Sequence, residues 1–208
     1  PTEKEKLVAA AKEEKLFDFV LPQPDWNNTP NEKGDLPKPV TETWTRHGKT
    51  HSHTFNRFPD GSDDDRWYGW RNHHWGTKWG DCDGILPEDN DETIFSYEFC
   101  SAWAPPNTSF LTAFSKLFPN AEITNRYAES DFFGVSVAKG GIAIDGSEDT
   151  TFIEEKWLKV NAPEIEDTCD LYEDENVDKY EEFMEVQCEL IEDRQDFMYE
   201  ELVKKFAD

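Results

Sequence analysis

Residues 93–118, with the sequence TIFSYEFCSAWAPPNTSFLTAFSKLF, contain two different periodicities in succession. From 93 to 103, aromatic side chains occupy alternate positions, which is the period of a β-strand. Pro105 and Pro106 end that pattern. Large apolar residues then recur at helical spacing from Thr108 until Pro119 ends the run. The stretch predicts a strand followed by a helix over 108–117, and therefore an α+β fold.

The flanking sequence predicts further elements of both kinds. Residues 3–17 carry apolar positions at helical spacing among Lys and Glu. Residues 121–128 and 132–137 are typical of two strands joined by a loop of hairpin length, and a short strand is expected at 142–144. Asn, Pro, Gly and Asp dominate much of residues 24–65, which predicts a loop-rich insertion that stays irregular to about residue 62.

The charge balance excludes several classes of partner. The 208 residues include 46 Asp and Glu against 21 Lys and Arg, giving a net charge of −25. Such a chain would repel nucleic acid and anionic membranes, so neither is expected to bind directly.

The four cysteines are widely spaced and form no C-x-x-C pair, which is typical of reduced thiols in a cytoplasmic protein. They are Cys82, Cys100, Cys169 and Cys188.

The excess negative charge is concentrated toward the C-terminus. Residues 145–208 hold 23 acidic and 6 basic residues. Within them, residues 177–206 show one long amphipathic pattern with a period of about 3.6 residues, which predicts a helix. We hypothesise that its carboxylates bind a basic surface on a host or phage protein, or imitate nucleic acid in the groove of a nucleic-acid-binding protein. The candidate residues are Glu181, Glu182, Glu185, Glu189, Glu192, Asp193, Asp196 and Glu200.

Two alternatives remain open. One is a small-ligand-binding protein or enzyme that uses the Trp67–Trp79 region, where four tryptophans occur within thirteen positions. The other is a structural homo-oligomer, such as a homodimer, joined through the 177–206 helix. The candidate pocket residues are Arg71, His73, His74, Trp75, Lys78, Trp79 and Trp103, with cationic groups over the aromatic rings.

No motif favours catalysis, a cofactor or a metal. The sequence lacks the Gly-rich phosphate loops, the nucleophile-elbow motif and the HExxH motif. The histidines at 47, 51, 53, 73 and 74 fit no standard metal-binding spacing. The Asp81-x-Asp83-Gly84 segment fails the EF-hand pattern, because Gly at the sixth position would require Trp79 at the first. We therefore expect a non-enzymatic protein without a cofactor.

Three segments together resemble a known family. They are Asn72-His73-His74-Trp75-Gly76-Thr77-Lys78-Trp79, then Phe99-Cys100-Ser101-Ala102-Trp103-Ala104-Pro105-Pro106, then Leu117-Phe118-Pro119. In this combination the chain resembles the YubB-type ferredoxin-like domain family, which plasmids and bacteriophages carry. Members usually open with a strand bearing an Asn-Trp-Cys motif, whereas this chain begins at the helix that follows it, so we expect that strand to be missing from the sheet.

The resemblance implies an architecture and a context rather than a reaction. It implies a ferredoxin-like antiparallel sheet with helices packed on one face and without an iron–sulfur cluster, in a phage or plasmid protein that acts in the host cytoplasm. With the charge distribution, it predicts a domain at 1–145 containing the 24–65 insertion, followed by an acidic helical extension at 146–208.

Overall fold

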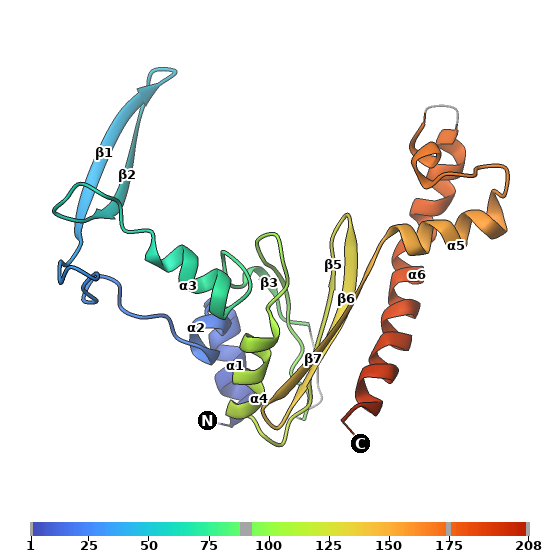
Figure 1. Ribbon diagram of the computed structural model, residues 1–208, viewed down its shortest axis with the longest axis horizontal. Coiled ribbons are helices and arrows are strands. Elements are labelled where there is room, and N and C mark those ends of the chain that lie inside the picture. The colour runs from blue at the N-terminus through green and yellow to red at the C-terminus, as the bar shows by residue number, and fades with distance from the viewer. Residues whose placement is uncertain (1, 88–92, 174–175, 207–208) are drawn as a thin grey trace. The chain divides into compact units, whose positions relative to one another are not determined.

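The computed structural model describes residues 2–87, 93–173 and 176–206, and these form an α+β protein (Figure 1). The chain divides into two compact units, residues 1–110 and 111–208. The described residues contain six α-helices and three small antiparallel sheets, so the predicted α+β class is confirmed. No described helix is long and apolar enough to cross a membrane. The predicted boundary at residue 145 lies within a strand of the second unit.

The described residues of the first unit form the helices α1 to α3 and two two-stranded sheets. Its core is aromatic: Phe17 stacks on Phe110 with ring centroids 4.3 Å apart and meets Trp75 edge to face at 5.5 Å. Phe17 lies in the short helix at residues 16–20, and Trp75 directly follows the helix at residues 66–74, so the ring contact joins these two parts of the chain. Its elements are α1 (Glu3–Lys12), α2 (Leu16–Val20), β1 (Lys38–Arg46), β2 (Lys49–Arg57), α3 (Arg66–His74), β3 (Cys82–Ile85) and β4 (Glu98–Cys100).

The second unit is built around a three-stranded sheet. Residues 133–138 in the central strand of this sheet are fully buried. Phe133, Val135 and Val137 of this strand pack against helix residues in the hydrophobic core. The predicted strands are confirmed, and the last one is longer than expected. The unit contains β5 (Ile123–Ala128), β6 (Phe132–Lys139), β7 (Ile142–Asp149), α5 (Thr151–Asn161), the 3₁₀ helix η1 (Thr168–Tyr172) and α6 (Val177–Lys204). The boundary between the units falls within α4 (Thr108–Leu117), whose predicted range is confirmed.

The helix predicted over residues 3–17 is interrupted. Thr2 and Glu5 form a capping box that starts α1, but this helix ends at Lys12. Glu14 adopts a positive φ of 52°, so the backbone turns before α2 begins at Leu16. The apolar stripe is therefore shared between two short helices.

The irregular structure expected up to residue 62 is wrong for most of the insertion. Residues 38–57 form a regular hairpin in which β1 and β2 pair over nine positions, with Arg46 opposite Lys49. His47 and Gly48 form the two-residue turn with positive φ angles of 50° and 73°, as a type I′ turn requires. Most of the hairpin side chains are exposed on both faces, so the pattern lacks the apolar–polar alternation that marks a half-buried strand.

Replacing Gly48 by Val should weaken this hairpin by about 1–2 kcal/mol, because a β-branched residue is strained at a φ of 73°. The nuclear Overhauser contacts between Thr41 and Thr54, whose hydroxyl oxygens lie 2.8 Å apart, should weaken. Asn tolerates this backbone region, so Gly48→Asn is the matched control and should keep those contacts. Equal contacts in all three proteins would contradict the assigned turn.

The strand predicted over 93–103 is also much shorter in the structure. Only Glu98–Cys100 forms β4, and its ladder with β3 pairs Cys82 with Cys100 and Ile85 with Glu98 across a register shift. The alternating pattern was present, but β3 offers only four residues to pair with. Sheets of two, two and three strands are separate in the described residues, and a ferredoxin-like arrangement is not confirmed.

Candidate functional site

The acidic helix α6 is held against the sheet of its own unit by one face. Phe183 is fully buried and contacts Trp157 with ring centroids 5.5 Å apart, and Leu202 is 4% exposed near the other end. α6 contacts β6 and β7 of the sheet and also α5 and η1 of the same unit (Figure 1). The remaining buried residues of this face are Ile191, Gln195 and Met198. The helix is therefore an integral part of the second unit.

Polar contacts fix the rotation of α6 on the sheet. The buried amide of Gln195 donates to the carbonyl oxygens of Tyr127 at 2.9 Å and Gly134 at 3.2 Å. Arg194 donates from Nε to Glu148 on β7 at 2.8 Å, and this guanidinium lowers the pKa of the Glu148 carboxyl. A buried amide needs partners, so rotating the helix would leave these groups unsatisfied.

The opposite face of α6 carries the predicted acidic residues. All eight candidates, from Glu181 to Glu200, are exposed. At 3.6 residues per turn they fall within an arc of about 120°, opposite the buried residues. Glu182 pairs with Lys179 at 2.8 Å and Asp196 with Arg126 at 2.6 Å. The other six make no salt bridge with any residue that the structure describes.

The acidic face of α6 can be compared with one strand of DNA in its length and in the spacing of its charges. At about 1.5 Å per residue, the helix rises about 28 Å between Glu181 and Glu200. Eight carboxylates with seven intervals over that length give one negative charge per about 4 Å, comparable with the spacing of about 3.4 Å along one strand of DNA. The carboxylates belong to flexible side chains on a fixed backbone, so the array can adapt to a basic surface at little backbone cost.

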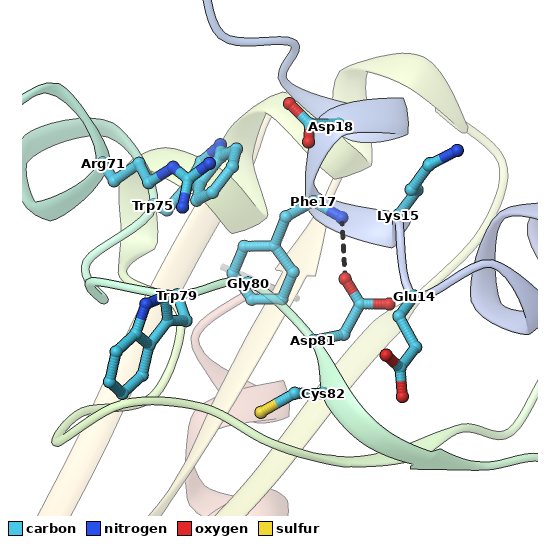
Figure 2. Close-up of a pocket in the computed structure, with 10 residues that line it drawn as sticks. All are labelled: Glu14, Lys15, Phe17, Asp18, Arg71, Trp75, Trp79, Gly80, Asp81 and Cys82. Atoms are coloured by element: carbon cyan, nitrogen blue, oxygen red, sulfur yellow. Dashed lines mark hydrogen bonds between the residues drawn. The ribbon is translucent and has the colours of Figure 1, made fainter. Parts of the chain in front are cut away.

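The Trp67–Trp79 region borders a pocket of about 300 Å³ in the first unit. Figure 2 shows the Arg71 guanidinium beside the Trp75 ring, with Asp81 on the other side of Phe17. Three predicted residues line the pocket: Arg71, Trp75 and Trp79. Four are not among its lining residues: His73, His74, Lys78 and Trp103. No sequence pattern predicted the remaining lining residues, which are Glu14, Lys15, Phe17, Asp18, Gly80, Asp81 and Cys82.

Arg71 is the most unusual charged group in this pocket. Its Nε donates to Gln23 at 3.2 Å, and its guanidinium lies 5.2 Å from the Trp67 ring centroid and 4.9 Å from that of Trp75. Burial lowers its pKa, while the negative charge of Asp18 acts in the opposite direction. It makes no salt bridge within the described part of the chain.

Asp81, on the opposite side of the pocket, has a structural role. The carboxylate is 6% exposed and accepts hydrogen bonds from the backbone N–H groups of Leu16 at 3.2 Å and Phe17 at 3.4 Å. The hydroxyl of Tyr97 donates to it at 3.0 Å, and burial together with Asp81 raises the pKa of that phenol. Asp81 therefore satisfies the first N–H groups of α2, and no local pattern could reveal a cap 65 residues away.

The predicted cation–aromatic contacts are present, but they are divided between the pocket and the surface. Lys78 Nζ lies 4.5 Å from the Trp79 ring centroid and 4.9 Å from that of Trp103. These two rings are 48% and 66% exposed, whereas Trp75 is 1% exposed. Of the three tryptophans among the candidate pocket residues, Trp75 is thus buried, whereas Trp79 and Trp103 form an exposed pair.

The histidines do not converge with other potential metal ligands. His47, His51 and His53 are exposed on the β1–β2 hairpin, and the His74 ring packs on Trp70 with centroids 4.4 Å apart. His73 is exposed on α3. Within residues 2–87, 93–173 and 176–206, no group of three or more His, Cys, Asp or Glu is arranged to hold a metal ion.

Comparisons with family models, with curated proteins and with solved structures gave no match for this chain. The resemblance to the YubB-type family therefore stays a prediction, as does an origin in a phage or plasmid. The geometry of α6 and the charge distribution are the observations that bear on function.

Proposed function

We propose that the protein is a non-enzymatic interaction protein that binds a basic protein surface through the acidic face of α6. The observation that carries this proposal is the division of the helix into two faces. One face is buried within the second unit, and the other presents eight exposed carboxylates.

An anchored helix is a better electrostatic partner than a flexible acidic tail. Binding does not have to order the backbone, so less free energy is lost on association. The net charge of −25 would also accelerate encounters with a basic partner through long-range attraction. Most of the acidic residues on this face have no internal counterion, so a partner can pair with them without breaking existing salt bridges.

The partner that fits this surface best is a protein groove that binds nucleic acid. Such grooves carry Lys and Arg at the spacing of phosphates, and the carboxylates of α6 are spaced similarly along the helix axis. We also propose, from the resemblance of the 72–79, 99–106 and 117–119 segments, that this protein comes from a phage or plasmid and acts in the host cytoplasm. The ferredoxin-like arrangement belongs to the same resemblance and stays a prediction.

The two alternatives receive less support. The pocket at Arg71 is also lined by Glu14, Asp18 and Asp81, so an anion would meet three carboxylates, and Asp81 already caps α2. A homo-oligomer through α6 would need its apolar face, yet Phe183, Ile191, Met198 and Leu202 are buried within the second unit.

The proposal is tested by neutralising part of the acidic face. The triple variant Glu185→Gln, Glu189→Gln, Glu192→Gln removes three exposed carboxylates from one stripe. Protamine, an arginine-rich DNA-binding protein, serves as the probe in a titration near physiological ionic strength. At about 0.5–1 kcal/mol for each exposed charge pair, the dissociation constant should rise about 10- to 100-fold.

The matched control removes the same charge elsewhere. Glu32, Asp131 and Glu173 are exposed and make no salt bridge with described residues. Changing them to Gln, Asn and Gln should leave the dissociation constant within about twofold, because screening limits distant charges. Duplex DNA should compete with the wild-type protein for protamine. Equal losses in both triple variants would mean that only net charge matters, and the proposed face would be rejected.

A further inference from the structure

Two of the four cysteines face each other across the small β3–β4 sheet. Cys82 and Cys100 occupy directly opposed positions in the antiparallel ladder. Opposed residues in such a ladder have Cα atoms about 4.5–5.5 Å apart and project their side chains to the same face of the sheet. Disulfide bonds need a Cα separation of about 4.4–6.8 Å, so the backbone already meets this requirement.

The side-chain contacts agree with the backbone register. The thiol of Cys82 donates to the carbonyl oxygen of Cys100 at 3.2 Å, so Sγ of one residue lies against the other residue. Both thiols are free, Cys100 being exposed and Cys82 partly buried. Cys169 in η1 and Cys188 in α6 lie outside the strands and have no ladder partner.

We propose that Cys82 and Cys100 form a redox-sensitive pair that a small-molecule disulfide oxidises to an intramolecular disulfide bond. This modification site is independent of the acidic face of α6. The structure contains the pair in its reduced form.

The reaction is two successive thiol–disulfide exchanges. The exposed Cys100 thiolate attacks one sulfur of the reagent, whose S–S bond breaks and releases one reagent thiolate. The Cys82 thiolate then attacks the Cys100 sulfur of the mixed disulfide and releases the second reagent thiolate. The two protons lost by the cysteines are taken up by the released thiolates. Two protein thiols are oxidised while one reagent disulfide is reduced to two thiols.

The electrostatic surroundings predict which cysteine reacts first and which reagents react fastest. Partial burial and the nearby carboxylates of Asp83, Glu14 and Asp81 raise the pKa of the Cys82 thiol. Tyr97, whose hydroxyl binds Asp81, also faces this thiol. Cys100 is exposed and is the natural entry point. An anionic reagent is repelled by these carboxylates, so a neutral disulfide should react faster.

Oxidation would stabilise a part of the molecule with few other constraints. The β3–β4 sheet contains only strands of four and three residues, and two-stranded sheets of this size are marginally stable. Cys82 also lines the pocket that contains Arg71, so a bond to Cys100 would restrict the motion of that side of the pocket. Backbone amides of β3 and β4 should therefore exchange at least tenfold more slowly with solvent after oxidation.

The test uses the full chain carrying Cys169→Ser and Cys188→Ser, so that only the pair remains. The protein is incubated with 2-hydroxyethyl disulfide, its remaining thiols are alkylated, and its intact mass is measured over time. The expected product has lost two hydrogen atoms, carries no reagent and contains no alkylatable thiol. Adding Cys82→Ser should instead leave a stable mixed disulfide at Cys100.

The folded geometry is tested by repeating the reaction in denaturing urea. Formation of the Cys82–Cys100 disulfide bond should be at least tenfold slower in urea, because the register of β3 and β4 is lost. The matched control carries Cys82→Ser and Cys100→Ser and should give only mixed disulfides at Cys169 and Cys188. Two stable adducts on the native pair, a disulfide between two chains, or equal closure rates with and without urea would each overturn the proposal.

Discussion

Replacing Phe183 by Ala should lower the free energy of unfolding of the second unit by about 3–5 kcal/mol, the usual cost of removing a buried aromatic ring. Phe183 is fully buried in the core of the second unit, where it contacts Trp157 on α5. The cavity would also weaken the packing of α6 in the core of the second unit, so amide hydrogen exchange along the helix should accelerate. Urea unfolding followed by circular dichroism, with exchange measured by segment, gives both quantities.

Met184 provides the matched control for this substitution. It is the next residue on α6 and is 45% exposed, so it lies largely outside the core. Met184→Ala should cost less than about 1 kcal/mol. If the two substitutions have equal and small effects, α6 is not anchored in the second unit through its Phe183 face, and the anchored helix on which the proposed function depends is lost.

Replacing Trp75 by Ala should destabilise the first unit by a similar amount, about 3–5 kcal/mol. Trp75 is 1% exposed and contacts Phe17 and Trp70 edge to face. Its indole N–H donates to the carbonyl oxygen of Leu21 at 2.9 Å, so the substitution also leaves a carbonyl group without its donor. The same urea titration and amide exchange in α2 and α3 should report the loss.

Trp79 lies four residues further along and is 48% exposed. Trp79→Ala should cost clearly less than Trp75→Ala, because about half of the Trp79 side chain stays in water in the folded protein. The pair of variants also separates structure from ligand binding, because both rings line the pocket but only Trp75 is a core residue. A larger loss for Trp79 than for Trp75 would contradict the assigned packing.

The elements predicted correctly are those whose pattern faces a core. Thr108–Leu117 and Val177–Lys204 carry apolar stripes at helical spacing, and the strand Phe132–Lys139 places Phe133, Val135 and Val137 at alternate positions in the core. In each case the period of the buried side chains fixes the type of element. The capping box at Thr2 and Glu5, which starts α1, was not among the predicted features although it is a local sequence signal.

The elements missed are those whose structure depends on pairing rather than burial. The β1–β2 hairpin is exposed on both faces, and its only strong signal is the His47-Gly48 turn between two threonine-rich segments. The strand at 93–103 shows the right alternation, but its length is limited by the short partner strand Cys82–Ile85. A single-sequence pattern carries little information about the length of a partner strand.

The candidate site also has a part that local sequence patterns predict and a part that depends on tertiary contacts. The carboxylates of α6 could be predicted to share a face, because helical spacing alone places them within one arc. What the other face contacts could not be predicted, since Phe183 and Gln195 meet residues far away in sequence. The pocket at Arg71 was missed in most of its lining for the same reason, as Asp81 and Phe17 are brought together only by tertiary contacts.

The most direct test of the acidic face of α6 is the salt dependence of protamine binding. The logarithm of the wild-type association constant should fall steeply and linearly with the logarithm of salt concentration, because paired charges release counterions. The Glu185, Glu189, Glu192 triple variant should give a clearly shallower slope, whereas the Glu32, Asp131, Glu173 variant should keep the wild-type slope. Identical slopes for all three proteins would show that α6 is not the surface that binds.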